Sequence, residues 1–393
     1  MSDEAGVSST LGLRYFRGAE ASTAGGGAYN VAMGSLPLPP DTLAPWDFAG
    51  LLLTYGCPAR CAICYVHAGP EQGGWMPVET AVSLWRSLDA LATAHGRTMR
   101  VHLAGGEPFG NWPRLVEIIR AARETGLTPL EKVETNAFWA TEDERVRSRL
   151  ATLHELGMQK LVVSSDVFHQ QFVPFERVRR CVEIGREVLG RTRVRVRWWD
   201  FYADPTDTAA LPAEERTAVF VDALARHPER LTGRAAATLA PRLPCGPAGA
   251  YAHQNCEREV LHSRHVHIDP DGNIFPGTCA GIILGRATEA PADGSDPCPS
   301  GCNRSNVAGV WHTLAATWRQ HPVVAPLATG GPGELLRRVV PLGYRERPEG
   351  YAGKCHLCAD IRRWLVERGF WREWVGPPAC YGLPTPITAA ASR

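Results

Sequence analysis

The sequence predicts an α/β protein with a parallel sheet, followed by a small cysteine-rich region that contains a β-hairpin and a helix. Two observations predict the sheet: short apolar segments of strand length recur along the chain, and segments with helical periodicity separate them. Strands that alternate with helices are typical of βαβ units, in which the strands pair in parallel. The second region is indicated by an Asp-Gly turn signal and by a late group of cysteines.

The expected elements follow one another between residues 48 and 227. The strands are expected at Phe48 to Thr54, Arg100 to Ala104, Leu130 to Thr135, Lys160 to Ser165 and Val194 to Asp200. The helices that follow the last three strands are expected at Thr141 to Leu156, Phe175 to Leu189 and Pro212 to His227. This stretch supplies five clear strands and a weak sixth. In α/β barrels the functional residues lie at the carboxyl ends of the strands, so candidate residues are sought there.

Length and composition indicate a globular chain with more than one domain. A chain of 393 residues with 44% apolar residues can fill two or three cores. We expect an N-terminal extension, partly flexible, over residues 1–43, a barrel core over 44–240, and the cysteine-rich region over 241–393.

Charge and apolar content argue against several functional classes. The formal net charge of +1 does not favour binding to nucleic acid or to an anionic membrane. The sequence has no apolar run of transmembrane length and no secretion signal at its start. Twelve cysteines without such a signal indicate metal binding in a reducing compartment, so a cytoplasmic location is expected.

A C-x3-C-x2-C loop follows the first apolar segment. Its cysteines are Cys57, Cys61 and Cys64. Three thiolates on one short loop can hold three irons of a 4Fe–4S cluster, which normally has four cysteine ligands. One iron would then stay open to another ligand. The alternative is a zinc site, which requires four ligands and would need a distant pair such as Cys355 and Cys358.

A Gly-Gly-Glu-Pro segment, residues 105–108, follows the expected strand at Arg100 to Ala104. The two glycines permit the backbone to approach a ligand closely, and the glutamate can accept hydrogen bonds from an ammonium group. By itself this tetrapeptide also fits an ordinary strand-to-helix turn.

Together with Tyr65, these two motifs resemble the signature of the radical S-adenosylmethionine (radical SAM) enzymes. The resemblance implies a partial (β/α)6 TIM-type barrel in which the open iron chelates the amino and carboxylate groups of S-adenosylmethionine. An electron from the cluster would then release a 5′-deoxyadenosyl radical. The residues to which it assigns catalysis and cluster binding are Cys57, Cys61 and Cys64, and those to which it assigns cofactor binding are Tyr65, Gly105, Gly106 and Glu107.

Polar residues at later strand ends are further candidates. Those that qualify by position are Glu134, Asn136, Ser164, Ser165 and Asp166, of which Asn136 and Ser165 are selected as cofactor-binding residues. Their alternative role is to cap the following helix, which Ser, Asp and Asn do well. His169 is a candidate for the substrate cavity or for a structural hydrogen bond.

The C-terminal region contains a second group of cysteines. Residues 265–279 predict a hairpin around Asp271-Gly272 that places Cys279 at its far end. Cys256 lies upstream, and Cys355 and Cys358 open a predicted helix, whose N-terminus favours negative charge.

This arrangement resembles the auxiliary-cluster domains, called SPASM or the shorter twitch form, that follow many radical SAM barrels. The full SPASM pattern has seven cysteines, so the resemblance implies only one auxiliary 4Fe–4S cluster here. Its expected ligands are Cys256, Cys279, Cys355 and Cys358. Cys245 or Cys380 can replace one member, and a zinc ion bound by all four thiolates is the alternative. Cys298 and Cys302 receive no role, and Cys181 is expected to be a buried apolar residue.

The resemblance implies that the radical removes a hydrogen atom from a substrate carbon. Maturation of a natural product, in particular of a ribosomal peptide, is the favoured function. The alternative is a dehydrogenase or epimerase of a sugar or nucleoside, with Cys245 or Cys380 as hydrogen donor, and a different class is a non-catalytic zinc-stabilised binding protein. The expected partners are a peptide or small-molecule substrate and an electron donor such as flavodoxin or ferredoxin, without nucleic acid or membrane.

Overall fold

The computed structural model describes residues 42–127, 129–287 and 306–384. Residues 1–41 of the expected N-terminal extension lie outside these ranges. Within them, no helix is both long enough and apolar enough to cross a membrane.

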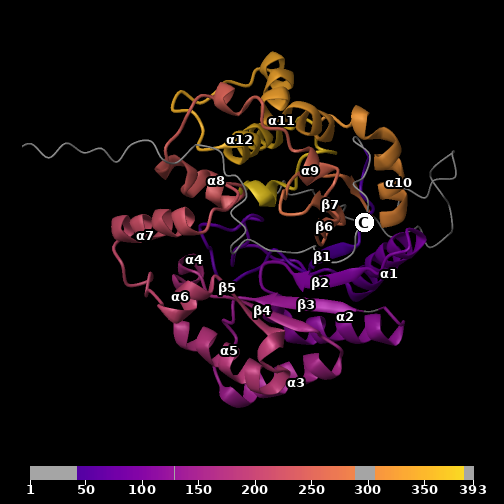
Figure 1. Ribbon diagram of the computed structural model, residues 1–393, viewed down its shortest axis with the longest axis vertical. Helices are drawn as coiled ribbons and strands as arrows, with labels where there is room; N and C mark the ends of the chain where they lie inside the picture. The colour runs from indigo at the N-terminus through magenta and orange to yellow at the C-terminus, as the bar shows by residue number, and fades with distance from the viewer. Residues whose placement is uncertain (1–41, 128, 288–305, 385–393) are drawn as a thin grey trace, which may run out of the picture. The chain divides into compact units, whose positions relative to one another are not determined.

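Eight strands form one sheet at the centre of the described chain (Figure 1). The strands are β1 (Phe48–Leu52), β2 (Arg100–Ala104), β3 (Leu130–Thr135), β4 (Lys160–Ser164), β5 (Val194–Arg197), β6 (His265–Ile268), β7 (Asn273–Pro276) and β8 (Gly285–Arg286). Their order in the sheet is β5-β4-β3-β2-β1-β6-β7-β8. The pairs from β5 to β6 are all parallel, whereas β6, β7 and β8 pair antiparallel.

Helices follow most of the parallel strands and continue through the C-terminal region. They are α1 (Val78–Ala94), α2 (Trp112–Glu124), α3 (Asp143–Glu155), α4 (Val167–Gln170), α5 (Phe175–Leu189), α6 (Trp199–Ala203), α7 (Ala213–Arg226), α8 (Arg234–Thr238), α9 (Glu257–Val260), α10 (Val307–Thr317), α11 (Val324–Val339) and α12 (Lys354–Arg368). In Figure 1, α1, α2, α3 and α5 lie on one side of the parallel strands, and α9, α11 and α12 lie on the other.

Alternate residues of each strand face opposite sides of the sheet, because side chains along a strand alternate. Leu51, Leu103 and Val133 are fully buried in the main core, which also contains Leu88 of α1 and Leu150 of α3. The intervening residues face the barrel interior, where several of them are polar. The apolar side therefore anchors the helices, and the interior side is available for chemistry.

The predicted α/β fold is confirmed, with two corrections. The expected strand Val194 to Asp200 ends early, since Trp198 has a left-handed backbone (φ 56°) and α6 begins at the next residue. The sixth parallel strand is β6, the first strand of the predicted hairpin, and it pairs with β1. The barrel sheet is therefore continuous with the hairpin that was expected in a separate region.

The hairpin and the helical positions of three cysteines agree with the prediction. The hairpin around Asp271-Gly272 forms from β6 and β7, and Cys355 and Cys358 lie in the first two turns of α12. Cys181 is fully buried in α5, as expected. The domain boundary at residue 240 stays a prediction, because the sheet itself crosses it.

Candidate active site

The three cysteines of the C-x3-C-x2-C loop line one cavity at the carboxyl ends of the parallel strands. The other predicted site residues that line it are Tyr65, Gly105, Gly106, Glu107, Asn136, Glu134, Ser164 and His169, and Arg197 of β5 also contributes. The strand order explains this convergence, because the carboxyl ends of neighbouring parallel strands meet at one edge of the sheet.

The sulfur atoms of two of these cysteines accept hydrogen bonds from nearby N–H groups. The Cys57 sulfur lies 3.5 Å from the backbone nitrogen of Ala59 and 3.5 Å from Nδ2 of Asn136. The Cys64 sulfur lies 3.3 Å from the backbone nitrogen of Ala68. Burial raises the pKa of both the Cys57 and the Cys64 thiol. Thiolate formation in this cavity therefore requires a positive partner such as iron.

Glu107 connects the ends of β2 and β3. Its side chain is buried, and it accepts hydrogen bonds from the Thr135 hydroxyl (2.8 Å) and the backbone N–H groups of Asn136 (2.7 Å) and Phe109 (3.1 Å). Burial raises the pKa of this carboxyl to about 7, against those three hydrogen bonds, which lower it. Much of the acceptor capacity of Glu107 is thus used within the protein, and one Oε2 lone pair is left for a ligand.

The two glycines before Glu107 are required by contacts within the protein. A Cβ atom on Gly105 would lie 2.6 Å from the Thr54 carbonyl oxygen, and one on Gly106 would lie 2.1 Å from the Gly56 carbonyl oxygen. The backbone N–H of Gly106 donates to Thr54, and that of Glu107 donates to Gly56. These glycines therefore fasten β2 to the start of the cysteine loop, in addition to lining the cavity.

The two candidates at the ends of β3 and β4 differ in position. Asn136 lines the cavity, contacts Cys57, and accepts a hydrogen bond from the Phe138 backbone at Oδ1 (3.0 Å). Ser165 is fully buried and is not among the lining residues, whereas Ser164 is. Because side chains alternate along the chain here, Ser164 at the end of β4 faces the cavity and Ser165, the next residue, faces away from it. Ser164 is therefore the better candidate for a cofactor contact.

Asp166 and His169 act together at the start of α4. Asp166 caps the helix by accepting hydrogen bonds from the backbone of Phe168 and His169, and its Oδ1 lies 2.8 Å from Nδ1 of His169. Although burial lowers the pKa of His169, the charges of Asp166 and Cys61 raise it well above the ordinary value. The capping role expected for Asp166 is confirmed, and His169 is a cavity residue with a structural hydrogen bond.

Arg234 of α8 supports the cysteine loop and was not singled out from the sequence. Its buried guanidinium donates to the backbone oxygens of Cys61 (2.9 Å), His67 (3.1 Å) and Ala68 (2.6 Å). Its own backbone N–H donates to the Cys64 oxygen. Nothing near Arg234 in the sequence marks this role, since the contacts join segments about 170 residues apart.

The cysteine loop offers three thiolates at the cavity, whereas a structural zinc site usually has four protein ligands. In a 4Fe–4S cubane each thiolate binds a different iron, so three thiolates leave one iron open to another ligand.

A known family model matches the part of the chain that contains the cysteine loop. Residues 51–189 match the model of the radical SAM superfamily, from β1 to the end of α5. The chain contains a radical SAM domain. The match includes the cysteine loop, the Gly-Gly-Glu-Pro segment and the strand ends that line the cavity, and it identifies the chain as an enzyme.

Solved structures show weak overall similarity. A crystal structure of BtrN in complex with AdoMet and 2-DOIA has 16% identity and a TM-score of 0.41, covering 74% of this chain and 89% of that chain. Native anSMEcpe with bound AdoMet and Cp18Cys peptide has 12% identity and a TM-score of 0.36, covering 83% and 98%. Neither similarity assigns a substrate to this chain. No curated protein matches the sequence significantly.

Outside the radical SAM domain, the four late cysteines lie near one another. Cys256 precedes α9, Cys279 follows β7, and Cys355 and Cys358 belong to α12. Burial, together with the neighbouring thiolates of Cys279 and Cys358, raises the pKa of Cys355 to about 12. Burial likewise raises the pKa of Cys256, with contributions from Cys358 and Cys279. Such mutual effects indicate that the four thiols are near neighbours.

A second arginine accompanies this group. Arg230, four residues before Arg234, donates a hydrogen bond from Nη1 to the Cys279 sulfur, 3.1 Å away. Burial lowers the pKa of Arg230, but the neighbouring Cys279 and Cys355 thiolates outweigh it, so the pKa is raised overall. Arg230, just before α8, and Arg234, its first residue, therefore supply one arginine to each cysteine group, although the sequence indicates only a connecting segment here.

The remaining cysteines have different surroundings. Cys245 is exposed, and its sulfur contacts the Leu243 carbonyl oxygen. Cys380 is buried, and its sulfur lies 3.4 Å from the Tyr55 hydroxyl, which also donates to Asp269. Cys298 and Cys302 lie outside the described residues.

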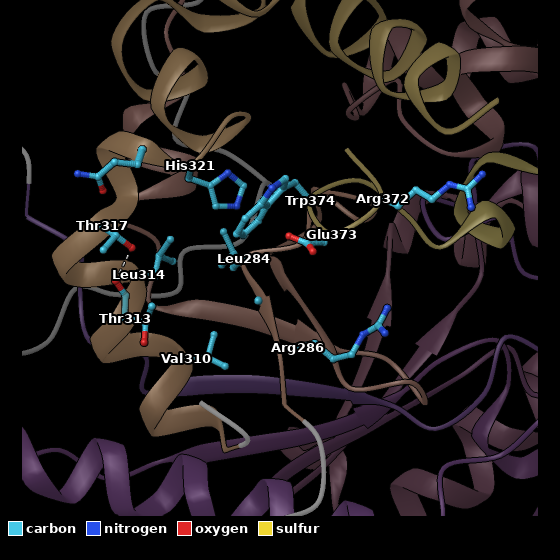
Figure 2. A pocket seen from close by; sticks show the side chains of 12 residues that line it. Leu284, Arg286, Val310, Thr313, Leu314, Thr317, His321, Arg372, Glu373 and Trp374 are labelled. Atoms are coloured by element: carbon cyan, nitrogen blue, oxygen red, sulfur yellow. Dashed lines mark hydrogen bonds between the residues drawn. The ribbon is translucent and has the colours of Figure 1, made fainter. Parts of the chain in front are cut away.

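A second hollow lies apart from the radical SAM domain, between α10, β8 and the segment that follows α12 (Figure 2). Leu284, Val310, Leu314 and Trp374 give it a mostly apolar lining. It shares no residue with the cysteine-lined cavity and contains no cysteine. The chemistry of the radical SAM domain is therefore assigned to the smaller cavity.

Proposed function

We propose that this radical SAM enzyme reductively cleaves S-adenosylmethionine and abstracts a hydrogen atom from a substrate carbon. The observation that carries the proposal is the convergence of Cys57, Cys61 and Cys64 with Glu107 and Asn136 on one cavity of the barrel. Three cysteines on one loop, within the part of the chain that matches the radical SAM model, support a 4Fe–4S cluster at this place.

Each residue has a proposed task. The three cysteines hold the cluster, and Glu107 and the backbone of residues 105–106 receive the amino group of the nucleotide. Asn136 donates toward the Cys57 sulfur, which stabilises negative charge there. When bound, the cluster and S-adenosylmethionine supply the 5′-deoxyadenosyl radical. Arg234 keeps the loop in the conformation in which the three thiols face the cavity.

A second 4Fe–4S cluster is proposed for the later cysteines, Cys256, Cys279, Cys355 and Cys358. Arg230 and the N-terminus of α12 provide positive charge beside it. This auxiliary cluster would accept the electron left on the substrate, which makes the net reaction an oxidation or a cross-link. A substrate-binding or structural role is the alternative. Reducing electrons would come from a donor such as flavodoxin or ferredoxin.

We propose a ribosomal peptide in natural-product maturation as the substrate. One observation supports a second candidate, a sugar or nucleoside: the cavity contains the charged or polar side chains of Glu134, Arg197 and His169. Such groups can hydrogen-bond several hydroxyls of a polar metabolite. In that case the reaction would be a dehydrogenation or an epimerisation.

Anaerobic reconstitution tests the proposed chemistry. The full-length protein should bind about eight irons per chain and become brown. With S-adenosylmethionine and a reductant it should release 5′-deoxyadenosine. The Cys57→Ala/Cys61→Ala/Cys64→Ala variant should retain about four irons and release none. A colourless protein that contains only zinc would instead support the non-catalytic binding protein.

Incubating the enzyme with members of both substrate classes distinguishes a peptide from a sugar or nucleoside. Incubation with candidate peptides and with amino sugars or nucleosides, followed by mass spectrometry, should show loss of two hydrogens from a peptide. Turnover of only the sugars or nucleosides would overturn the peptide proposal and support the second candidate.

A further inference from the structure

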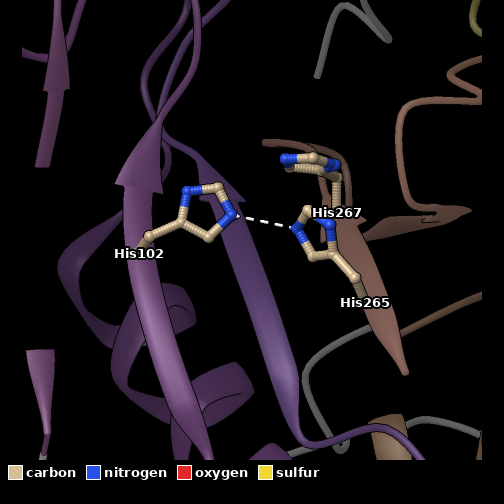
Figure 3. A group of neighbouring side chains, drawn as sticks. All are labelled: His102, His265 and His267. Carbon is tan, nitrogen blue, oxygen red and sulfur yellow. Dashed lines mark hydrogen bonds between the residues drawn. The ribbon is translucent and has the colours of Figure 1, made fainter. Parts of the chain in front are cut away.

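Three histidines from two strands meet inside the barrel sheet. His102 lies on β2, and His265 and His267 lie on β6, with β1 between these strands (Figure 3). Gly50 of β1 is the register partner of both His102 and His267. A Cβ atom on Gly50 would lie 2.3 Å from Cδ2 of His267 and 2.5 Å from Nε2 of His102. The three imidazoles can therefore meet only because β1 has a glycine here.

The ring nitrogens are close enough to share one ion. One nitrogen from each of the three rings lies within 4.8 Å of the other two, and Nε2 of His102 is 3.0 Å from Nε2 of His265. Two imidazole nitrogens that bind one ion at about 2.1 Å are typically separated by roughly 3.0–3.4 Å. The observed separation thus fits a shared ion as well as a hydrogen bond.

The outer nitrogen of His267, Nδ1, has the partner that metal-bound histidines have. It lies 2.7 Å from the Gly277 carbonyl oxygen, so it donates there and leaves Nε2 with a lone pair. A carbonyl behind the imidazole fixes the ligand tautomer and increases its basicity. Nδ1 of His102 lies 3.4 Å from Oε1 of Glu134 without hydrogen-bond geometry, and its Nε2 faces His265.

Two of the three histidines are buried and His265 is half-buried, and the group borders the cysteine-lined cavity. His102 is 1% exposed and His267 is 3% exposed. Glu134 and Tyr65 both line that cavity, and the Tyr65 hydroxyl lies 3.3 Å from Nε2 of His267. An ion bound by the histidines would have an oxygen donor within reach on this side. Glu134, which also pairs with Lys132, would supply negative charge near it.

We propose that His102, His265 and His267 bind a single divalent transition-metal ion of the Zn²⁺ type. Three imidazole nitrogens leave at least one position open, as in catalytic zinc sites, and a water or a substrate oxygen would occupy it. The site is separate from both cysteine groups and does not depend on cleavage of S-adenosylmethionine. A hydrogen-bonded histidine cluster without a metal is the competing explanation.

Equilibrium dialysis against Zn²⁺ tests this site directly. The full-length protein, with its iron reconstituted, should retain about one zinc per chain after chelating resin removes loosely bound metal. Its zinc X-ray absorption spectrum should show only nitrogen and oxygen ligands at about 2.0–2.1 Å. His102→Gln and His265→Gln, on different strands, should each weaken zinc binding at least tenfold. His312→Gln, an exposed position on α10, is the matched control and should bind zinc like the unchanged protein.

Three results would overturn the proposal. They are no retained zinc in the unchanged protein, a sulfur shell near 2.3 Å in the spectrum, and unchanged zinc binding in both glutamine variants. The spectrum of the unchanged protein decides the question even if a variant does not fold. The Cys57→Ala/Cys61→Ala/Cys64→Ala variant should keep the nitrogen-bound zinc, which separates this site from the proposed radical chemistry.

Discussion

Arg234 shows how much one side chain can do for a cofactor loop. Its guanidinium donates three hydrogen bonds. They reach the backbone oxygen of Cys61 in the cysteine loop and those of His67 and Ala68 just after it. The loop from Cys57 to Cys64 is short, so it has few internal contacts that could hold its three thiols in one orientation. A buried guanidinium from another segment supplies them, because it has five N–H donors in a rigid plane.

Replacing Arg234 should therefore destabilise the first cluster. Arg234→Ala removes one donor from each of three backbone oxygens. Those of Cys61 and His67 keep the Cys64 N–H and the Gln72 side chain as donors, whereas Arg234 is the donor described for Ala68, so its loss costs about 1–3 kcal/mol at that oxygen. We expect the iron content to fall from about eight toward about four per chain and 5′-deoxyadenosine release to fall at least tenfold. Arg363→Ala, which removes an exposed pair with Glu367, should change neither quantity. Full iron content in Arg234→Ala would contradict this role.

Arg230 provides the corresponding prediction for the second group of cysteines. Its positive charge, 3.1 Å from the Cys279 sulfur, stabilises the more negative, reduced state of a cluster at that place. Arg230→Gln should therefore lower the reduction potential of the auxiliary cluster, measured by electron paramagnetic resonance during redox titration. The potential of the first cluster should stay the same. If only the first cluster shifts, Arg230 does not act where we propose.

At the scale of elements, the N-terminus of α11 depends on a neutral histidine. Nδ1 of His321 accepts hydrogen bonds from the backbone N–H groups of Val323 and Val324, and its Nε2 donates to the Ile283 carbonyl oxygen. Protonation at Nδ1 would remove both accepted bonds. Burial accordingly lowers the pKa of His321 from 6.5 to about 4.

This shift predicts a pH dependence of stability. Between pH 6.5 and 4 the unfolded chain takes up a proton at His321 that the folded chain does not, so the free energy of unfolding falls as the pH falls. The contribution amounts to roughly 3 kcal/mol at most. Melting temperatures at pH 7.5 and pH 5.5 should show a larger acid-induced decrease for the unchanged protein than for His321→Ala. Equal decreases would show that His321 does not titrate in this way.

The β1 strand illustrates how one element serves two sites. Its odd-numbered residues belong to the apolar core, and Gly50 makes room for the three histidines on the other side. Its carboxyl end leads into the cysteine loop. A substitution such as Gly50→Ala would therefore disturb both the barrel interior and the position of the loop.

At the scale of the whole molecule, the C-terminal segment brings Cys380 back to the barrel. The 3₁₀ turn Pro378–Tyr381 places this buried thiol beside Tyr55, which lies two residues before Cys57. Of the two cysteines considered as hydrogen donors, Cys380 is buried and Cys245 is exposed. Only the fold brings Cys380 to this end of the sheet.

Cys380 separates an oxidation from an epimerisation. If the enzyme oxidises or cross-links its substrate, as proposed, Cys380→Ser should keep turnover within about twofold, and product formed in D₂O should carry no deuterium at the reacting carbon. Turnover and deuterium content are read by mass spectrometry with the substrate found above. Deuterium incorporation that is lost in Cys380→Ser would instead establish an epimerase with Cys380 as donor.

Much of the architecture could be predicted from local patterns. The extents of β3 and α5 agree with the prediction, because apolar periodicity reports which face of an element is buried. The expected strand at residue 194 is too long, since its sequence does not show that Trp198 turns into the left-handed region. The membership of β6 in the barrel sheet was also missed, because pairing between strands more than 200 residues apart leaves no local signal.

The sequence by itself determined the type of chemistry, since three cysteines within eight residues and a nearby Gly-Gly-Glu-Pro segment are local features. The tertiary structure alone decided which distant side chains meet: Arg234 and the cysteine loop, Arg230 and Cys279, and the three histidines around Gly50. The physical reason is that short-range motifs are set by neighbouring residues, whereas hydrogen bonds, charges and ion sites depend on atoms that only chain folding brings within a few ångströms.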